Sequence, residues 1–249
     1  MATRSLVALL CGLLPLVGQA GSLRVGPMRV DLSTRHPIAV LEVQNTGDSA
    51  TLAQLDQFAW SQAGADDVLE PTTDLITTPL VLNLTPGETR QVRVGLRQAT
   101  PAAAEHNYRL FVREVTPTFS AALGLRFAVR IGVPVFVAPV EARGGTVSLA
   151  SELSWHWVPD IDGCARVQVA NPATHHDRVL AAEMLSAGGE VLWRAAEPAY
   201  VLASSRRSLK PAVCAPSLKE VVTLRLAMES GTVNLPAEAT SLVVDANSH

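Results

Sequence analysis

The chain has 249 residues, of which 48% are apolar and 17% charged, and its formal net charge is −3. A disordered chain would have fewer apolar and more charged residues, and a nucleic-acid-binding protein would usually carry an excess of Lys and Arg, so the composition argues against both classes. At roughly 100–200 residues per domain, the length predicts one large domain or two ordinary domains.

The first 20 residues have the pattern of a secretory signal peptide. Arg4 supplies the positive start, residues 6–17 form an apolar core, and Gly18-Gln19-Ala20 is a small-residue cleavage pattern. The core is too short for a membrane-spanning helix, and no later apolar run approaches the roughly 20 residues that such a helix needs. We therefore expect export, cleavage after Ala20 and no stable membrane insertion; the alternative is a buried N-terminal helix.

Residues 21–139 are predicted to form a domain of β-strands. Residues 91–97 alternate strictly between polar and apolar side chains, which is the period of a half-buried strand. Turn sequences at Asn45-Thr46-Gly47-Asp48 and Thr85-Pro86-Gly87-Glu88 separate segments of this kind. About seven strands at this spacing indicate an immunoglobulin-like β-sandwich.

The most informative segment of this domain runs from Leu123 to Val137, where every second residue is apolar. A strand of this length would extend roughly 50 Å, against a usual 17–20 Å. Pro134 has no N–H and therefore indicates a sheet edge or a break. A long apolar edge strand promotes aggregation, so its presence in an exported chain favours donation of the strand to another protein. The alternative is a central strand that bends near Gly132-Val133-Pro134.

A linker is predicted around residues 139–145, and short predicted strands beyond it indicate a second β-sandwich over residues 140–249. The expected fold is therefore all-β, with two immunoglobulin-like β-sandwich domains in series. Cys164 and Cys214 are the cysteines that remain after cleavage. Because disulfides persist in export compartments, we expect these two cysteines to be paired; two free buried thiols are the alternative.

Several stretches occur together in an order that is typical of one family: Pro27-Met28-Arg29-Val30, Leu84-Thr85-Pro86-Gly87-Glu88, residues 108–115 and Val133-Pro134-Val135-Phe136-Val137. Over residues 23–139 the chain resembles the PapD-like periplasmic chaperones of the chaperone–usher pilus pathway. The last stretch is most similar to the Csu or spore-coat-U branch. The resemblance implies a periplasmic protein that binds pilin or coat-protein subunits, delivers them to an outer-membrane usher and needs no cofactor or metal.

The resemblance also implies how a subunit is bound. Chaperones of this family insert their seventh strand into subunits that lack their last strand, and alternate apolar side chains of the inserted strand fill the exposed groove. In this chain the donor residues would be Leu123, Leu125, Phe127 and Val129.

A basic pair in the family binds the terminal carboxylate of the subunit between the domains. Arg29 matches the first member of this pair, whereas Gly132 or Pro134 stands where a lysine is expected. We take Arg113, in the neighbouring strand, as the substitute, since a guanidinium can bind a carboxylate through two hydrogen bonds. Glu114 matches a glutamate that joins an interdomain salt bridge, and its partner is unidentified.

Other functions have little support in the sequence. It contains no nucleophile-elbow, zinc-protease, P-loop or dinucleotide-binding motif, so we expect no enzyme and no catalytic residue. His175-His176 favours a polar loop over a metal site, because adjacent residues of a strand point to opposite faces. Trp155 and Trp157 share one face of a predicted strand, which leaves open a secreted carbohydrate-binding module as the second interpretation.

Overall fold

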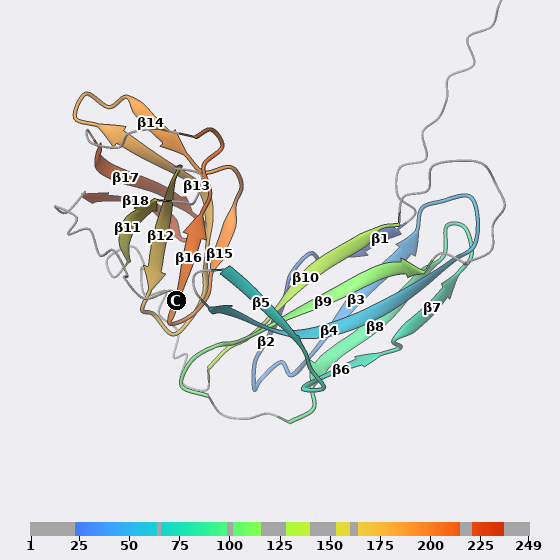
Figure 1. Cartoon of the computed structure of the whole chain (residues 1–249). Coiled ribbons are helices and arrows are strands. Elements are labelled where there is room, and N and C mark those ends of the chain that lie inside the picture. Colours follow the sequence, from blue (N-terminus) through green and yellow to red (C-terminus); the bar gives the residue numbers. More distant parts are fainter. Residues whose placement is uncertain are drawn as a thin grey trace, which may run out of the picture.

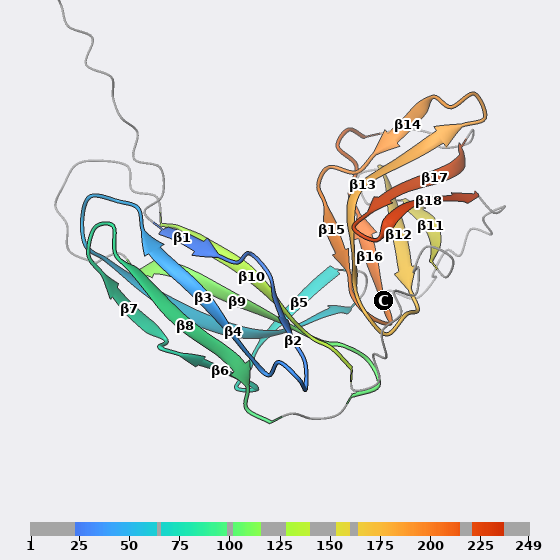
Figure 2. The ribbon, with the colours of Figure 1, turned by 180° about the vertical axis from the view of Figure 1, so that it is seen from behind.

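The computed structural model describes residues 23–63, 66–98, 102–115, 128–139, 153–159, 164–214 and 221–236. Within these ranges all regular secondary structure is β-strand. The strands form two sandwiches that meet at one end (Figures 1 and 2). The predicted all-β fold with two sandwiches is thus confirmed. The described residues include no helix with the length and hydropathy needed to cross a bilayer.

The first sandwich consists of two sheets. One sheet has the order β1-β3-β8-β6, with bounds Leu23–Gly26, Ile38–Asn45, Thr89–Leu96 and Leu75–Thr78. The other has the order β2-β10-β9-β4-β5, with bounds Val30–Leu32, Arg130–Val137, His106–Val115, Thr51–Ala63 and Asp66–Pro71. The strand β7 (Val81–Leu84) also pairs with β4, which is long enough to hold β7 at its start and β5 at its end.

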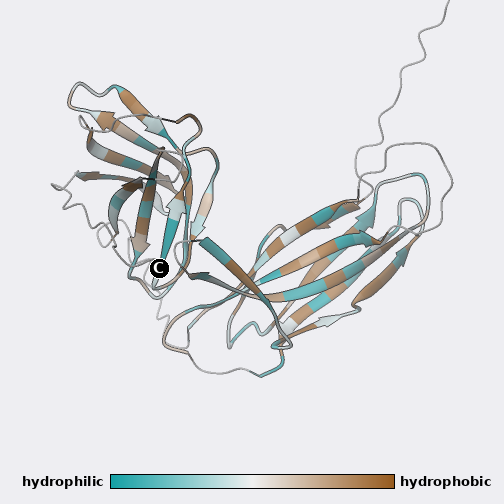
Figure 3. Cartoon of the chain, viewed as in Figure 1, coloured by the Kyte–Doolittle hydropathy of each residue, from teal (hydrophilic) through white to brown (hydrophobic). Residues whose placement is uncertain are grey.

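The two sheets pack through side chains that alternate along each strand. Leu41 and Val43 of β3 face Leu110 and Val112 of β9 across the core, and all four are inaccessible to solvent. Figure 3 shows hydrophobic and hydrophilic residues alternating along these strands. The strands were predicted from side chains that alternate with a period of two, and burial in the core follows the same period.

The first predicted strand is divided between the two sheets. β1 pairs antiparallel with β3, whereas β2 pairs parallel with β10 in the opposite sheet. Residues 27–29 cross between them. As a result Arg29 lies directly before β2, beside the strand that was predicted to be donated.

The second sandwich has fewer strands than the first within the described residues. Its three-stranded sheet has the order β11-β12-β16, with bounds Ser154–Pro159, Ala165–Asn171 and Ser205–Leu209. Its other sheet has the order β14-β13-β17-β18, with bounds Val191–Arg194, Asp177–Ser186, Val221–Met228 and Gly231–Pro236, and β15 (Ala199–Val201) also pairs with β13. A disulfide joins Cys164, just before β12, to Cys214, which follows β16.

Candidate functional site

One side of β10 is only partly covered. β9 pairs with β10 over residues 130–137, whereas β2 pairs only with residues 135–137. Residues 130–134 therefore have no strand on their second side within the described part of the chain. The predicted long strand began at Leu123; residues 123–127 lie outside the described residues, and β10 begins at Arg130.

The position of Pro134 fits this open edge. The Glu114 N–H donates to the Val129 carbonyl oxygen at 2.9 Å, and these residues are opposite each other when the β9–β10 register is extended by one residue. Because hydrogen-bonded and non-hydrogen-bonded pairs alternate in an antiparallel ladder, the main chain of Arg130, Gly132 and Pro134 points away from β9. The missing N–H of Pro134 thus costs no hydrogen bond to β9. The backbone N–H and C=O groups of Arg130 and Gly132 point toward the open edge.

The apolar alternation of β10 serves the core of the first sandwich. Val133, Val135 and Val137 are buried in that core, and Ile131 packs against it. Val129 continues the same parity and is half-buried. The other three predicted donor residues, Leu123, Leu125 and Phe127, lie outside the described residues.

On the outward face of the same sheet, two arginines flank Pro134. β2 is aligned so that Val30 lies opposite Val135, which puts Arg29 level with Pro134. On the other side of β10, Arg109 lies directly opposite Pro134. Neighbouring strands are about 4.8 Å apart, so the two arginine backbones are roughly 10 Å apart.

Arg109 was missed by the sequence analysis. Its guanidinium carbon lies 4.8 Å from the centre of the Trp60 ring, and within the described residues its buried Nε has no hydrogen-bond partner. Burial lowers the pKa of Arg109, while the nearby Asp67 carboxylate acts in the opposite direction. An unpaired donor in a buried guanidinium is uncommon in a folded protein, and a guanidinium can still bind an anion through its other N–H groups.

Gly132 makes room for this arginine. A Cβ atom at Gly132 would lie 3.0 Å from a ring carbon of Phe111 and 3.3 Å from Arg109 Nε. A side chain at Gly132 would therefore require Phe111 or Arg109 to shift by a few tenths of an ångström. The basic residue that the family resemblance predicts on β10 is therefore absent, and Arg109 of β9 lies opposite Pro134 and beside Gly132.

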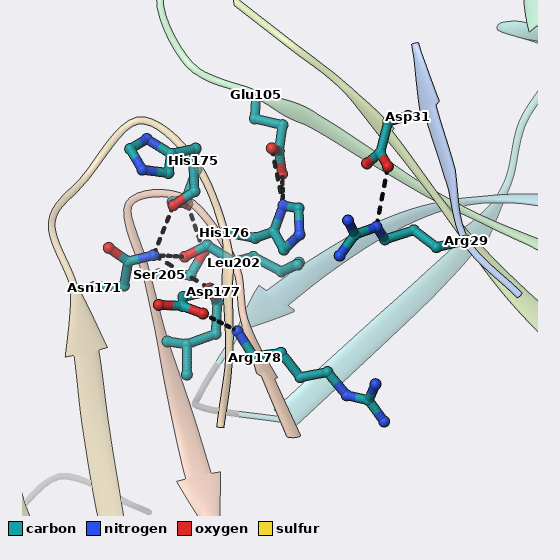
Figure 4. Close-up of polar contacts among 12 residues, drawn as sticks. Arg29, Asp31, Glu105, Asn171, His175, His176, Asp177, Arg178, Leu202 and Ser205 are labelled. Carbon is teal, nitrogen blue, oxygen red and sulfur yellow. Dashed lines mark hydrogen bonds and ion pairs between the residues drawn. The ribbon is translucent and has the colours of Figure 1, made fainter. Parts of the chain in front are cut away.

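Arg29 already has two carboxylate partners. Its Nε lies 3.0 Å from Asp31 Oδ2 (Figure 4), and its Nη1 lies 2.7 Å from Oε1 of Glu229 in the second sandwich. Partial burial works to lower the pKa of Arg29, but the hydrogen bonds and charges of Glu229 and Asp31 together raise it. The residue is thus a charged group that links the two domains.

Arg113 is in a different environment from the one that we expected. It lies four residues beyond Arg109 on β9, or about 13 Å along the strand. Its Nε lies 2.7 Å from Asp56 Oδ2 and its Nη2 donates to Gln54 Oε1 at 2.7 Å. The expectation that Arg113 lies near the second domain is corrected, because the register puts Arg109 there instead.

Glu114 also makes its contact within the first sandwich. Its Oε1 accepts a hydrogen bond of 3.1 Å from the Thr51 hydroxyl at the start of β4. This end of the sheet is the one farther from the second sandwich (Figure 1). The acidic residue before β9 that reaches the second sandwich is Glu105, whose two carboxylate oxygens lie 2.8 and 2.9 Å from His176 Nδ1 (Figure 4).

We use the term domain junction for the contact of Glu105 with His176 and the interdomain contacts around it. The His176 ring stacks on Phe136 of β10, with ring centres 3.5 Å apart. Phe136 and Trp60 of the first sandwich form an apolar cluster with Leu202 and Tyr200 of the second. His176 therefore lies in a loop, as predicted, but its ring is part of the junction.

Polar contacts surround the apolar cluster of the junction. The Gln62 side chain donates to the Tyr200 carbonyl oxygen at 2.8 Å and accepts from the Leu202 N–H at 3.0 Å. Arg207 Nη1 lies 2.8 Å from Asp67 Oδ1. These contacts join β4 and β5 to the second sandwich and hold the two domains together beside Arg29 and Arg109.

The features that suggested other functions have structural roles. Trp155 and Trp157 pack against the core of the second sandwich, and the Trp155 indole N–H donates to the Pro236 carbonyl oxygen at 3.1 Å. Within the described residues, no group of three or more His, Cys, Asp or Glu side chains is arranged to hold a metal ion. The carbohydrate-binding interpretation is therefore not favoured.

Comparison with known proteins agrees with this architecture. The family model described as the pili and flagellar-assembly chaperone, PapD N-terminal domain, matches residues 22–143. No curated protein sequence matches the chain.

Solved structures of chaperones are similar to nearly the whole chain. One belongs to the CsuC–CsuE chaperone–tip adhesion subunit pre-assembly complex from the archaic chaperone–usher Csu pili of Acinetobacter baumannii, with 19% identity, a TM-score of 0.65, and 86% of this chain and 98% of that chain covered. The YadV chaperone has 16% identity, a TM-score of 0.62 and coverages of 87% and 99%. The complex of the SafA pilin with the SafB chaperone of Salmonella enterica has 18% identity, a TM-score of 0.61 and coverages of 88% and 98%. At these identities the likeness establishes the fold.

Proposed function

Because the chain belongs, through residues 22–143, to the pili and flagellar-assembly chaperone family, we propose that it binds pilus or coat-protein subunits by donating the edge of β10. The observation that carries the proposal is the open side of β10 over residues 130–134. An incomplete sandwich can add its own strand to this edge through main-chain hydrogen bonds, and side chains of one parity then give specificity.

The donor segment extends this edge toward the N-terminal side of β10. Leu123, Leu125 and Phe127 share the parity of Val129 and of the core residues of β10, so they would enter the groove of the subunit. At about 1.5–3 kcal/mol for each fully buried large apolar side chain, four such residues give a gross gain of about 6–12 kcal/mol before the costs of ordering.

Arg29 and Arg109 are the pair that we assign to the terminal carboxylate of the subunit. The support is their common level on either side of Pro134 and the unpaired, buried Nε of Arg109 in the described part of the chain. Arg113 is the weaker candidate, since it lies opposite Arg130, four residues along β10 from the level of Arg29 and Pro134.

The proposed setting is the periplasm. Residues 1–20 have the signal-peptide pattern and lie outside the described residues. In this setting the chaperone would carry its subunit to an outer-membrane usher, and its work is binding rather than catalysis. The similar structures include a complex of a chaperone with a tip adhesion subunit and a complex of a chaperone with a pilin, which supports partners of this kind.

The test compares two neighbouring substitutions in the donor segment. Phe127→Asp would put an unpaired carboxylate into the apolar groove of a subunit, at a cost of several kcal/mol. Arg126→Asp changes the opposite face of the same strand and is the matched control. We expect co-purification of a small secreted β-rich subunit, co-expressed in the periplasm, to be lost with Phe127→Asp and retained with Arg126→Asp. Equal capture by both folded variants would refute strand donation.

The anchor is tested in the same assay. Removing one charge-assisted contact to a buried carboxylate costs about 2–5 kcal/mol, so Arg29→Ala and Arg109→Ala should each weaken capture by at least tenfold. Arg113→Ala is the control and should have a much smaller effect. A larger loss of capture with Arg113→Ala than with Arg109→Ala would instead assign Arg113 as the second anchor residue.

A further inference from the structure

We propose that Glu229 competes with the terminal carboxylate of the subunit for Arg29. In the free protein the second sandwich would then hold an internal carboxylate in the anchor, which an arriving subunit displaces. This inference rests on the proposed function, in which Arg29 is one half of the anchor.

Two of the three guanidinium nitrogens of Arg29 already bind carboxylates. Its Nε binds Asp31 Oδ2 at 3.0 Å and its Nη1 binds Glu229 Oε1 at 2.7 Å. A carboxylate that makes two parallel hydrogen bonds to a guanidinium uses either both Nη groups or Nε with one Nη. Each of these pairs contains Nε or Nη1, so an incoming carboxylate would lie against the negative charge of Asp31 or Glu229 and compete with it.

Glu229 is the partner that can leave. The Arg29 and Glu229 side chains are 38% and 45% exposed, and ion pairs at such exposure are weak because water screens them. Once released, the Glu229 carboxylate can be hydrated where it is. Asp31 is only two residues from Arg29 on the same strand face, so it stays close whatever the second sandwich does.

The exchange does not require the domains to separate. Glu229 is on the β17–β18 hairpin, and its backbone N–H donates to the Arg178 carbonyl oxygen at 2.9 Å. Ser230 also donates to the Asp177 carboxylate, so the hairpin is attached to β13 at two points. The junction contacts of Gln62 with Leu202 and of Glu105 with His176 remain when the Glu229 side chain rotates away.

The first experiment tests competition without a subunit, using acetate as the carboxylate probe. The Nε–H signal of Arg29, assigned with Arg29→Lys, is followed by NMR while acetate is added to the full chain and to Glu229→Gln. We expect the variant to respond at an acetate concentration about two- to fivefold lower, which is the range for loss of an exposed ion pair. Glu183→Gln is the control, because Glu183 pairs with Arg194 and Arg225 within the second sandwich. Equal acetate responses of the native chain and Glu229→Gln would overturn the proposal.

The second experiment uses subunit capture and a double-mutant cycle. Glu229→Gln should raise the affinity for the subunit by about two- to fivefold in the native background and leave it unchanged in Arg29→Ala. An equal gain in both backgrounds would show that Glu229 acts elsewhere and would refute the competition. If no variant captures a subunit, the proposed function fails, whereas an acetate response that depends on Glu229 would still support the internal contact.

Discussion

The two sandwiches stabilise a turn with the same device. Asn45 ends β3 and Asn171 ends β12, and their exposed fractions are 0% and 1%. Each side-chain oxygen accepts the N–H of the residue two positions later, Gly47 or Ala173. Each amide nitrogen donates to backbone carbonyl oxygens on the other side of the turn. A buried asparagine thus replaces the hydrogen bonds that the strand can no longer provide.

The difference lies in what each asparagine holds. Asn45 donates to Ser49 and Leu84, at the end of the first sandwich that is farther from the second (Figure 1). Asn171 donates to the Leu202 carbonyl oxygen, and the N–H of Leu202 itself donates to Gln62 across the domain junction. The same local structure therefore stabilises a turn far from the junction in the first domain. In the second domain it supports the contact between the domains.

The largest expected difference in stability between the two sandwiches comes from the disulfide of the second. Replacing both Cys164 and Cys214 by Ser opens a loop of 50 residues, for which chain entropy predicts a loss of about 4 kcal/mol in the free energy of unfolding. Only the second sandwich should lose protection, as measured by hydrogen exchange and mass spectrometry of each domain. The control is the native protein with a reducing agent, which should behave in the same way. Equal losses in both domains would mean that the two sandwiches unfold as one unit.

The asparagines give the next largest effect. Asn45→Ala and Asn171→Ala should each cost about 3 kcal/mol, because buried carbonyl groups lose their donors. Urea unfolding followed with domain-specific probes measures both. Asn171→Ala should in addition alter NMR signals of Trp60, which packs with Leu202, whereas Asn45→Ala should not. If both substitutions change the Trp60 signals equally, the Asn171 turn is no more closely coupled to the domain junction than the Asn45 turn, and the distinction is wrong.

The junction itself is tested by the two adjacent histidines. His176→Ala removes the stack on Phe136 and the pair with Glu105, at a cost of about 1–2 kcal/mol. We expect a change of domain orientation in small-angle scattering and residual dipolar couplings. His175→Ala is the matched control, since the contact of His175 with Asn171 uses only its carbonyl oxygen. Identical scattering from both variants would contradict the role of the His176 ring.

The sequence was sufficient for the architecture because strand burial has a period that can be counted. The alternation over residues 91–97 predicted a strand, and β8 runs over Thr89–Leu96. The turn predicted at Thr85-Pro86-Gly87-Glu88 follows β7 directly, with Gly87 at a positive φ of 77°. Local patterns of this kind depend only on neighbouring residues.

The anchor residues could not be ranked in this way, because their positions depend on the register between strands. Arg109 and Arg113 have the same parity on β9, so alternation puts both on the outward face. Only the pairing of Arg109 with Pro134 shows which of them is level with Arg29. His176 was interpreted as part of a polar loop for a similar reason, since its burial comes from Phe136, which is distant in the sequence.

The smallest effect concerns one turn in each sandwich. The Glu88 carboxylate accepts hydrogen bonds from the N–H and hydroxyl of Thr85, and these, with a hydrogen bond from Arg90, lower the pKa of Glu88 to about 2. In the second sandwich, the turn after β13 uses the Ser186 hydroxyl, which accepts the Glu190 N–H at 3.1 Å and does not titrate in this range.

The two turns should therefore differ in their response to acid. Because the pKa of Glu88 is lower in the folded than in the unfolded chain, its stabilising contribution is complete above the unfolded value of about 4.3 and is lost as the pH falls toward 2. The NMR signals of Thr85 should shift over this window, while those of Ser186 should not. Glu88→Gln removes the titrating group, so the Thr85 shift should disappear. A Thr85 shift that persists in this variant would assign the acid response to another carboxylate, and the contrast between the turns would then be lost.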